Sequence, residues 1–244
     1  MPNQIDEFKK YLCLEAKKRN VKIKFKKNLK TFGETNLNDL KNKCIFLKDL
    51  KDDRYIDIYK YTFFHELAHL KYSRISSIIN KTYINKMTED YCFKDGNNFY
   101  IDLTKKDMKI VFMLFNCIED AMVDSRLIGK NKSMSYLYEQ FLKFNFREKL
   151  SVFHKNDYVS HIGFMIKLFL TSKRYFEIFI KNFGMKKSYL KKMKFNEFLN
   201  LVKINDIKKS NSLNNFKMAI KIFKKAKEYG FGARFQNKSE FVLF

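Results

Sequence analysis

The scarcity of proline and glycine most limits the folds open to this chain. Its 244 residues include one proline, Pro2, and seven glycines, whereas Phe alone contributes 27 residues. Proline interrupts helices, and both residue types are common in tight turns. A chain rich in Leu, Lys, Ile and Phe with so few turn residues is typical of a mainly helical protein. Since 45% of the residues are hydrophobic, we expect a sizeable core rather than disorder.

Hydrophobic periodicity predicts a small N-terminal sheet among helices. Ile5, Phe8, Leu12 and Ala16 are spaced for one face of a helix. Residues 21–25 alternate apolar and basic side chains, as a half-buried strand does. The predicted helices cover about residues 4–19, 57–72, 104–129, 134–150, 158–183, 188–203 and 213–229. The predicted strands cover 21–25 and 43–47, with a hairpin around 94–98, a polar turn over 31–40 and irregular chain over much of 73–103.

These elements define a fold class and a domain division. The fold is expected to be mainly α with a small N-terminal β-sheet, an α+β arrangement. We expect a domain boundary near residue 130, with a domain over 1–130 and a basic helical region over 131–244 that packs on it or extends it.

The formal net charge of +24 is unevenly distributed. Residues 1–130 carry 26 basic and 18 acidic side chains, a net charge of +8, and residues 131–244 carry 24 and 8, a net charge of +16. The second half is therefore the better place for an anionic partner, such as nucleic acid or an acidic protein surface. The alternative is a compositional origin, because the basic residues are overwhelmingly Lys, whereas forked phosphate contacts favour Arg.

The cysteines and the apolar segments indicate in which cellular compartment the protein is expected. Four widely separated cysteines without a C-x-x-C pair are typical of reduced thiols inside a cell. The N-terminus has no apolar signal core. The most apolar segment, 162–170, is short and contains Lys167, so no membrane span is expected. We therefore expect a cytoplasmic protein.

Five residues in the helix predicted over 57–72 carry a metal-binding pattern. His65-Glu66-Leu67-Ala68-His69 places two imidazoles four residues apart, and hence on one face of a helix. Two such nitrogens can bind one zinc ion, and Glu66 beside them can act as a general base. The pattern predicts a Zn²⁺ site with His65 and His69 as ligands and Glu66 as the catalytic residue.

A third ligand must come from elsewhere, because catalytic zinc normally has three protein ligands and a water. A further histidine in the spacing His-x-x-Gly-x-x-His is excluded, since Tyr72 and Ile75 occupy the Gly and His places. A downstream helix offers carboxylates instead. At about 100° per residue, Glu119 falls on the margin of the apolar stripe and is the preferred ligand. Asp120 is the alternative, with Asp120 or Asp124 orienting a histidine N–H.

The segments FFHELAHLKYSR and NCIEDAMVDSRL resemble the zinc metallopeptidases of phages, plasmids and bacterial mobile elements. In that family an HExxH helix precedes a helix of the type N-x-x-E-D-A-R-x-E, and a von Willebrand factor A-like domain often follows. The resemblance covers about residues 55–130 and implies a zincin-like, gluzincin-type domain with an acidic ligand at 119–120. Met122 stands where the family often has Arg, and Asp124 where it often has Glu. No Asp-x-Ser-x-Ser motif follows residue 130, so a von Willebrand-type domain is not expected.

The expected function is hydrolysis of peptide bonds in a peptide or protein substrate. Zinc would activate a water molecule, and Glu66 would move its proton to the leaving amine. The candidates for stabilising the oxyanion are Tyr72, Arg126, His154 and His161. The alternative function is a catalytically inactive, zincin-like basic module that binds nucleic acid or a protein partner. The intact Glu66 argues against this alternative, and the charge of the second half argues for it.

Overall fold

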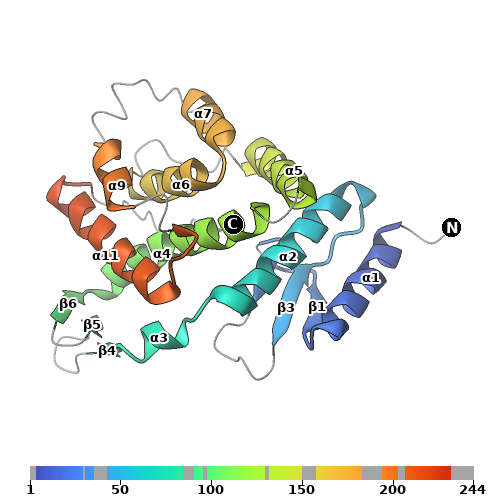
Figure 1. The fold of residues 1–244 in the computed structure, drawn as a ribbon, viewed down its shortest axis with the longest axis horizontal. Coiled ribbons are helices and arrows are strands. Elements are labelled where there is room, and N and C mark those ends of the chain that lie inside the picture. Colours follow the sequence, from blue (N-terminus) through green and yellow to red (C-terminus); the bar gives the residue numbers. More distant parts are fainter. Residues whose placement is uncertain are drawn as a thin grey trace. The chain divides into compact units, whose positions relative to one another are not determined.

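The described chain is mainly helical with two small sheets (Figure 1). The computed structural model describes residues 4–29, 31–35, 43–84, 91–95, 98–129, 132–149, 158–182, 194–202 and 207–231. The helices are α1 (Gln4–Lys18), α2 (Ile56–Tyr72), α3 (Ser76–Ile79), α4 (Lys105–Ile128), α5 (Lys132–Lys149), α6 (Tyr158–Thr171), α7 (Lys173–Asn182), α9 (Phe195–Leu201) and α11 (Ser212–Glu228), with a 3-10 turn η1 (Asp53–Tyr55). The strands are β1 (Lys22–Lys26), β2 (Gly33–Thr35), β3 (Cys44–Lys48), β4 (Thr82–Ile84), β5 (Tyr91–Asp95) and β6 (Asn98–Leu103).

Contacts between residues divide the chain into two compact units. Unit 1 takes its described residues from 1–73 and 126–148, and unit 2 from 74–125 and 149–239. Helix α4 belongs to both, because Lys105–Ser125 falls in unit 2 and the last turn in unit 1. A division by contacts does not test where independently folding domains end, so the predicted boundary near residue 130 stays a prediction.

Unit 1 contains a mixed three-stranded sheet in the order β1-β3-β2. The two predicted strands are confirmed as β1 and β3, which pair in parallel with Ile23 opposite Ile45. The expected turn over residues 31–40 is wrong for Gly33–Thr35, which form β2 and pair antiparallel with β3. A three-residue strand containing glycine is too short for periodicity to reveal.

Helices α1 and α2 form one apolar core with this sheet. The amphipathic face predicted for α1 is confirmed, since Ile5, Leu12 and Ala16 are buried. Tyr59 of α2 donates a hydrogen bond to the Lys48 carbonyl and accepts one from the Leu50 backbone N–H, which ties α2 to the end of β3. Burial raises the pKa of Tyr59 to about 12. Helix α2 is therefore fixed against the sheet along its length.

Helix α5 completes the described part of unit 1. The Tyr61 ring of α2 packs against Tyr138 and Phe141 of α5, with ring centroids 5.3 and 4.7 Å apart. Phe144 packs edge-on against Phe32 and Tyr55. Aromatic side chains thus join α5 to α2, to η1 and to the residue that precedes β2.

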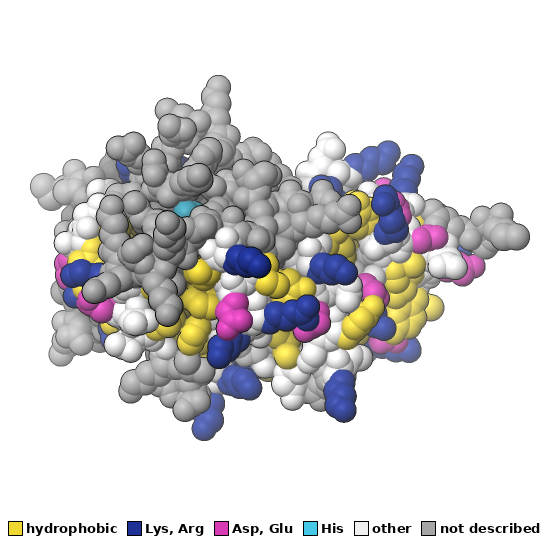
Figure 2. All heavy atoms as spheres, turned by 90° about the horizontal axis from the view of Figure 1, so that it is seen from above, with side chains coloured by type: hydrophobic (Ala, Val, Ile, Leu, Met, Phe, Trp, Pro, Cys, Tyr) yellow, Lys and Arg dark blue, Asp and Glu magenta, His cyan; other side chains and the backbone are white. Residues whose placement is uncertain are grey.

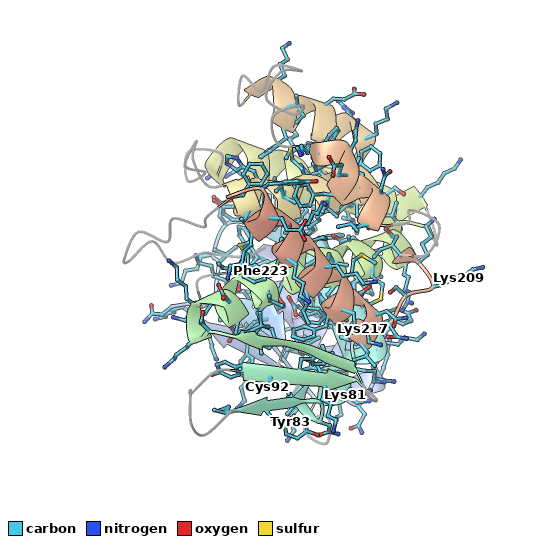
Figure 3. The ribbon with its side chains drawn as sticks, turned by 90° about the vertical axis from the view of Figure 1, so that its left-hand side faces the viewer. Lys81, Tyr83, Cys92, Lys209, Lys217 and Phe223 are labelled. Atoms are coloured by element: carbon cyan, nitrogen blue, oxygen red, sulfur yellow. The ribbon has the colours of Figure 1, made fainter. Side chains whose placement is uncertain are left out.

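Unit 2 contains the antiparallel sheet β4-β5-β6 and the helices around α4 and α11 (Figure 3). The predicted hairpin is confirmed by the pairing of β5 with β6. Phe216 of α11 lies at the centre of an aromatic cluster, with its ring centroid 5.1 Å from that of Phe93, 5.5 Å from Phe112 and 5.7 Å from Phe115. This cluster joins α11 to both the sheet and α4.

Several predicted boundaries need correction. The single helix expected over 158–183 is two helices, α6 and α7, which meet at Ser172. The segment 73–103, expected to be irregular over much of its length, also contains α3 and β4. Of the helix predicted over 188–203, residues 195–201 are helical, and 188–193 lie outside the described residues. None of the helices in the described part of the chain has the length and apolar character needed to cross a membrane.

Candidate metal centre

The two motif histidines lie side by side on helix α2. His65 and His69 are both buried, and their Nε2 atoms are 3.0 Å apart. Two nitrogens that bind one tetrahedral zinc ion at about 2.1 Å each lie about 3.4 Å apart. The two nitrogens therefore need to move apart by only a few tenths of an ångström to accommodate an ion. The spacing of four residues predicted this shared orientation.

Ser73 orients one of these rings. It is the residue at which α2 ends, with extended backbone angles and its N–H hydrogen-bonded to the carbonyl of His69. Its Oγ lies 2.9 Å from Nδ1 of His69. If Nε2 were to bind a metal, Nδ1 would carry the ring proton and donate a hydrogen bond to this hydroxyl. The end of the helix thus fixes the histidine ring, a role that the sequence had suggested for Asp120 or Asp124.

Glu66 lies where strand β2 approaches helix α2. The carboxylate residue is buried, and a Cβ atom added to Gly33 of β2 would lie 3.1 Å from its Cγ and 2.4 Å from Cγ2 of Thr62. Any side chain on Gly33 would therefore displace the wall of the site. Glycine permits this close approach of strand to helix.

Helix α4 is buried on all sides around the predicted third ligand. Every residue from Cys117 to Ser125 is buried, so the face opposite the apolar stripe is covered as well. Position on the stripe consequently does not separate Glu119 from Asp120. Their hydrogen-bond partners do.

Glu119 is held by the first turn of α11. Its Oε1 accepts a hydrogen bond of 2.6 Å from Ser212 Oγ, and its Oε2 accepts one of 2.7 Å from Asn215 Nδ2. Ser212 Oγ in turn accepts from the backbone N–H of Arg74 at 2.7 Å, and Asn215 Oδ1 accepts from Ser210 Oγ at 2.6 Å. Both carboxylate oxygens of Glu119 are therefore engaged within unit 2, in a network that joins α11 to α4.

Asp120 has a different partner. Its Oδ2 accepts a hydrogen bond of 2.8 Å from Nζ of Lys167, a buried lysine of α6. The same ammonium lies 3.6 Å from Oδ2 of Asp124, one helical turn further along α4. Cys117 lies on the neighbouring part of this face. Burial raises the pKa of its thiol to about 12, with a further rise from the charge of Asp120 and an opposing effect of Lys167. Cys117 therefore packs as a neutral thiol.

His65, His69 and Asp120 form a buried group that could hold a metal ion. One potential ligand atom from each residue lies within 4.8 Å of the other two. Two imidazole nitrogens and one carboxylate oxygen are a donor set that suits zinc and several other transition metals. The group has the ligand types that a catalytic zinc site uses, and it includes Asp120 rather than Glu119. Which carboxylate binds an ion stays a prediction.

The remaining candidates are dispersed. The Tyr72 ring packs under Arg126, whose guanidinium carbon lies 4.7 Å from the ring centroid. His161 is buried in α6 with its ring 6.3 Å from that of Phe179. His154 lies outside the described residues. The contacts of the described candidates do not indicate which residue would stabilise the oxyanion.

Three residue roles were absent from the sequence interpretation. Ser73 and Ser212 are ordinary serines at helix ends, and no pattern distinguishes them. Lys167 did carry a signal, since it interrupts the most apolar segment of the chain. A lysine on a helix that is otherwise buried must find an anionic partner.

Comparison with known proteins identifies no relative. No family model matches the chain, and neither the curated proteins nor the solved structures contain a match. The function is therefore inferred from the site alone.

Proposed function

We propose that the chain is a zinc-dependent metallopeptidase, with His65, His69 and Asp120 as the metal ligands. The observation that carries the proposal is the buried group of these three residues. Asp120 is preferred to Glu119 because both oxygens of Glu119 already accept hydrogen bonds from α11. A zinc ion bound there supplies a Lewis acid and activates a water molecule.

Glu66 is the general base of the proposed reaction. It follows His65 directly and precedes His69 by three residues, nearly one turn of α2, so it lies in the same part of the helix as the two imidazoles. The carboxylate accepts a proton from the attacking water and returns it to the leaving nitrogen. Removing the carboxylate without changing its size should abolish this step and leave the ligands in place.

Strand β2 is a suitable place for an extended peptide. It lies at the edge of the described sheet, and its Gly33 lies close to the side chain of Glu66. An edge strand offers unpaired backbone groups with which an extended peptide can pair. A peptide bound there would run past the carboxylate of Glu66. This arrangement supports a peptide rather than a small-molecule substrate.

The metal site is tested by zinc content. The purified full chain should contain close to one zinc per molecule by atomic absorption, and His65→Ala should lose it. Zinc that persists undiminished in His65→Ala would refute the assignment of the ligands.

Catalysis is tested separately with Glu66→Gln. We expect the wild type to cleave members of a proteome-derived peptide library, read by mass spectrometry, and Glu66→Gln to retain zinc without cleavage. Cleavage at an undiminished rate in this variant would exclude Glu66 as the base. Zinc binding without cleavage by the wild type would favour the non-catalytic zinc-binding module instead.

A further inference from the structure

Lys167 is a buried cation next to the proposed metal ligand. It belongs to α6, whose other residues around it are apolar, and it is 3% exposed. Its Nζ lies 2.8 Å from Oδ2 of Asp120 and 3.6 Å from Oδ2 of Asp124. A buried ammonium is stable only with anionic or hydrogen-bonding partners. These contacts all lie within unit 2.

A glycine brings the lysine to these carboxylates. A Cβ atom on Gly163 would lie 3.2 Å from both Sγ of Cys117 and Cδ2 of Leu114, so α6 approaches α4 closely at this point. One helical turn further along α6, Lys167 meets Asp120, which is nearly one turn beyond Cys117 on α4. The close crossing of the two helices thus places the ammonium on the acidic face of α4.

The charges around Lys167 are unequal. One ammonium faces two buried carboxylates, so the three side chains carry a formal net charge of −1. Asp120 also belongs to the group proposed to bind zinc. The ammonium and a metal ion would therefore share one carboxylate.

We propose that Lys167 is an internal counter-cation that holds Asp120 in place without metal and weakens the binding of the ion. This inference rests on the proposed metal site. In a buried site of low dielectric, an ammonium and a divalent ion on the same carboxylate repel each other strongly. Lys167 is thus a positioning residue that sets metal affinity, and it stabilises the metal-free protein.

The two roles predict opposite effects of removing the charge. Without the ammonium, the metal-free protein keeps two buried carboxylates and loses a cation that contacts both, which lowers its stability. The same loss removes the repulsion and tightens metal binding. A lysine with a merely structural role would produce the first effect without the second.

The test measures the zinc dissociation constant of the full chain by competition with a chelator at pH 7. Lys167→Gln retains a hydrogen-bond donor and loses the charge, Lys167→Met loses both, and Lys167→Arg retains the charge. We expect Lys167→Gln and Lys167→Met to bind zinc at least about 10-fold more tightly than the wild type, and to melt at a lower temperature in EDTA. Lys167→Arg should stay within about threefold of the wild-type constant.

Each result has one interpretation. Equal or weaker zinc binding by Lys167→Gln, beside a wild type that binds zinc, overturns the role of Lys167 and leaves the metal site intact. If Lys167→Gln binds zinc and the wild type does not, the result supports the proposal that the Lys167 ammonium weakens metal binding at Asp120. Failure of both proteins to bind overturns this inference together with the proposed site. If Lys167→Met does not fold in EDTA, Lys167→Gln decides.

Discussion

Ser73 connects the end of α2 to the chemistry of His69. The backbone N–H of Ser73 closes the last turn of the helix, while its hydroxyl lies 2.9 Å from Nδ1 of His69. A hydrogen bond to the second nitrogen of a ligating histidine fixes both its tautomer and its orientation. A residue that ends a helix therefore also orients the proposed metal ligand.

Replacing this hydroxyl should weaken metal binding. We predict that Ser73→Ala raises the zinc dissociation constant by about 10-fold, because partners of ligating residues typically contribute 10- to 100-fold in affinity. The measurement is a competition titration with a chelator. Ser125→Ala is the matched control, since Ser125 Oγ is buried and has no hydrogen-bond partner among the described residues. An equal loss of affinity in both variants would contradict the role of Ser73.

Glu119 and Asp120 should differ in what their removal changes. We predict that Glu119→Gln lowers the free energy of unfolding by about 2 kcal/mol and leaves zinc stoichiometry unchanged, because an amide cannot accept both hydrogen bonds from Ser212 and Asn215. Asp120→Asn should instead lose zinc. Urea unfolding and atomic absorption distinguish the two. Loss of zinc in Glu119→Gln with retention in Asp120→Asn would restore Glu119 as the ligand.

The proposed metal ligands differ in how far the sequence predicts them. The orientation of His65 and His69 follows from helical periodicity alone, because both lie on one helix. The third ligand depends on tertiary packing. The apolar stripe of α4 favoured Glu119, yet burial continues around the helix where α6 covers the face of Asp120. Helical geometry gives the direction of a side chain and not the element that it meets.

Strand β2 and helix α2 depend on one another through Gly33. The strand has three residues, and its glycine lies against the part of α2 that carries Glu66. The antiparallel pairing with β3 holds the strand at this distance. The shortest strand of this sheet, β2, thus packs against Glu66, the candidate catalytic residue.

A methyl group at Gly33 should disturb the packing of β2 against α2. Its Cβ would lie 2.4 Å from Cγ2 of Thr62, so Gly33→Ala should lower the free energy of unfolding by about 1–3 kcal/mol, measured in urea. Thr62→Ser removes the opposing methyl group and should restore much of this loss in the double variant. Gly163→Ala, whose nearest contacts are 3.2 Å, should lose less. A double variant no more stable than Gly33→Ala would refute the clash.

The elements themselves were predictable in proportion to their length. Long periodic segments gave α1, α2, α4 and α11 nearly at their observed bounds. The short strands β2 and β4 were not predicted, because three residues do not establish an alternation of apolar and polar side chains. The break between α6 and α7 at Ser172 also escaped, since apolar residues continue on both sides of it.

The net charge is a property of the molecule as a whole. Among the described residues visible in Figure 2, Lys and Arg side chains lie interspersed with apolar and acidic ones. A diffuse positive charge attracts polyanions without selecting a sequence. The expectation of an anionic partner for residues 131–244 therefore stays a prediction.

Zinc binding should stabilise the whole chain. An ion that binds only the folded state contributes about 2.7 kcal/mol at a free concentration 100 times its dissociation constant. For a chain of this size, we expect the melting temperature to rise by about 5–10 °C when zinc replaces EDTA. Scanning calorimetry of the wild type and His65→Ala provides the comparison, and the variant should show little rise. An equal rise in both proteins would mean that zinc acts elsewhere on the molecule, since His65 supplies one of the two imidazoles in the group.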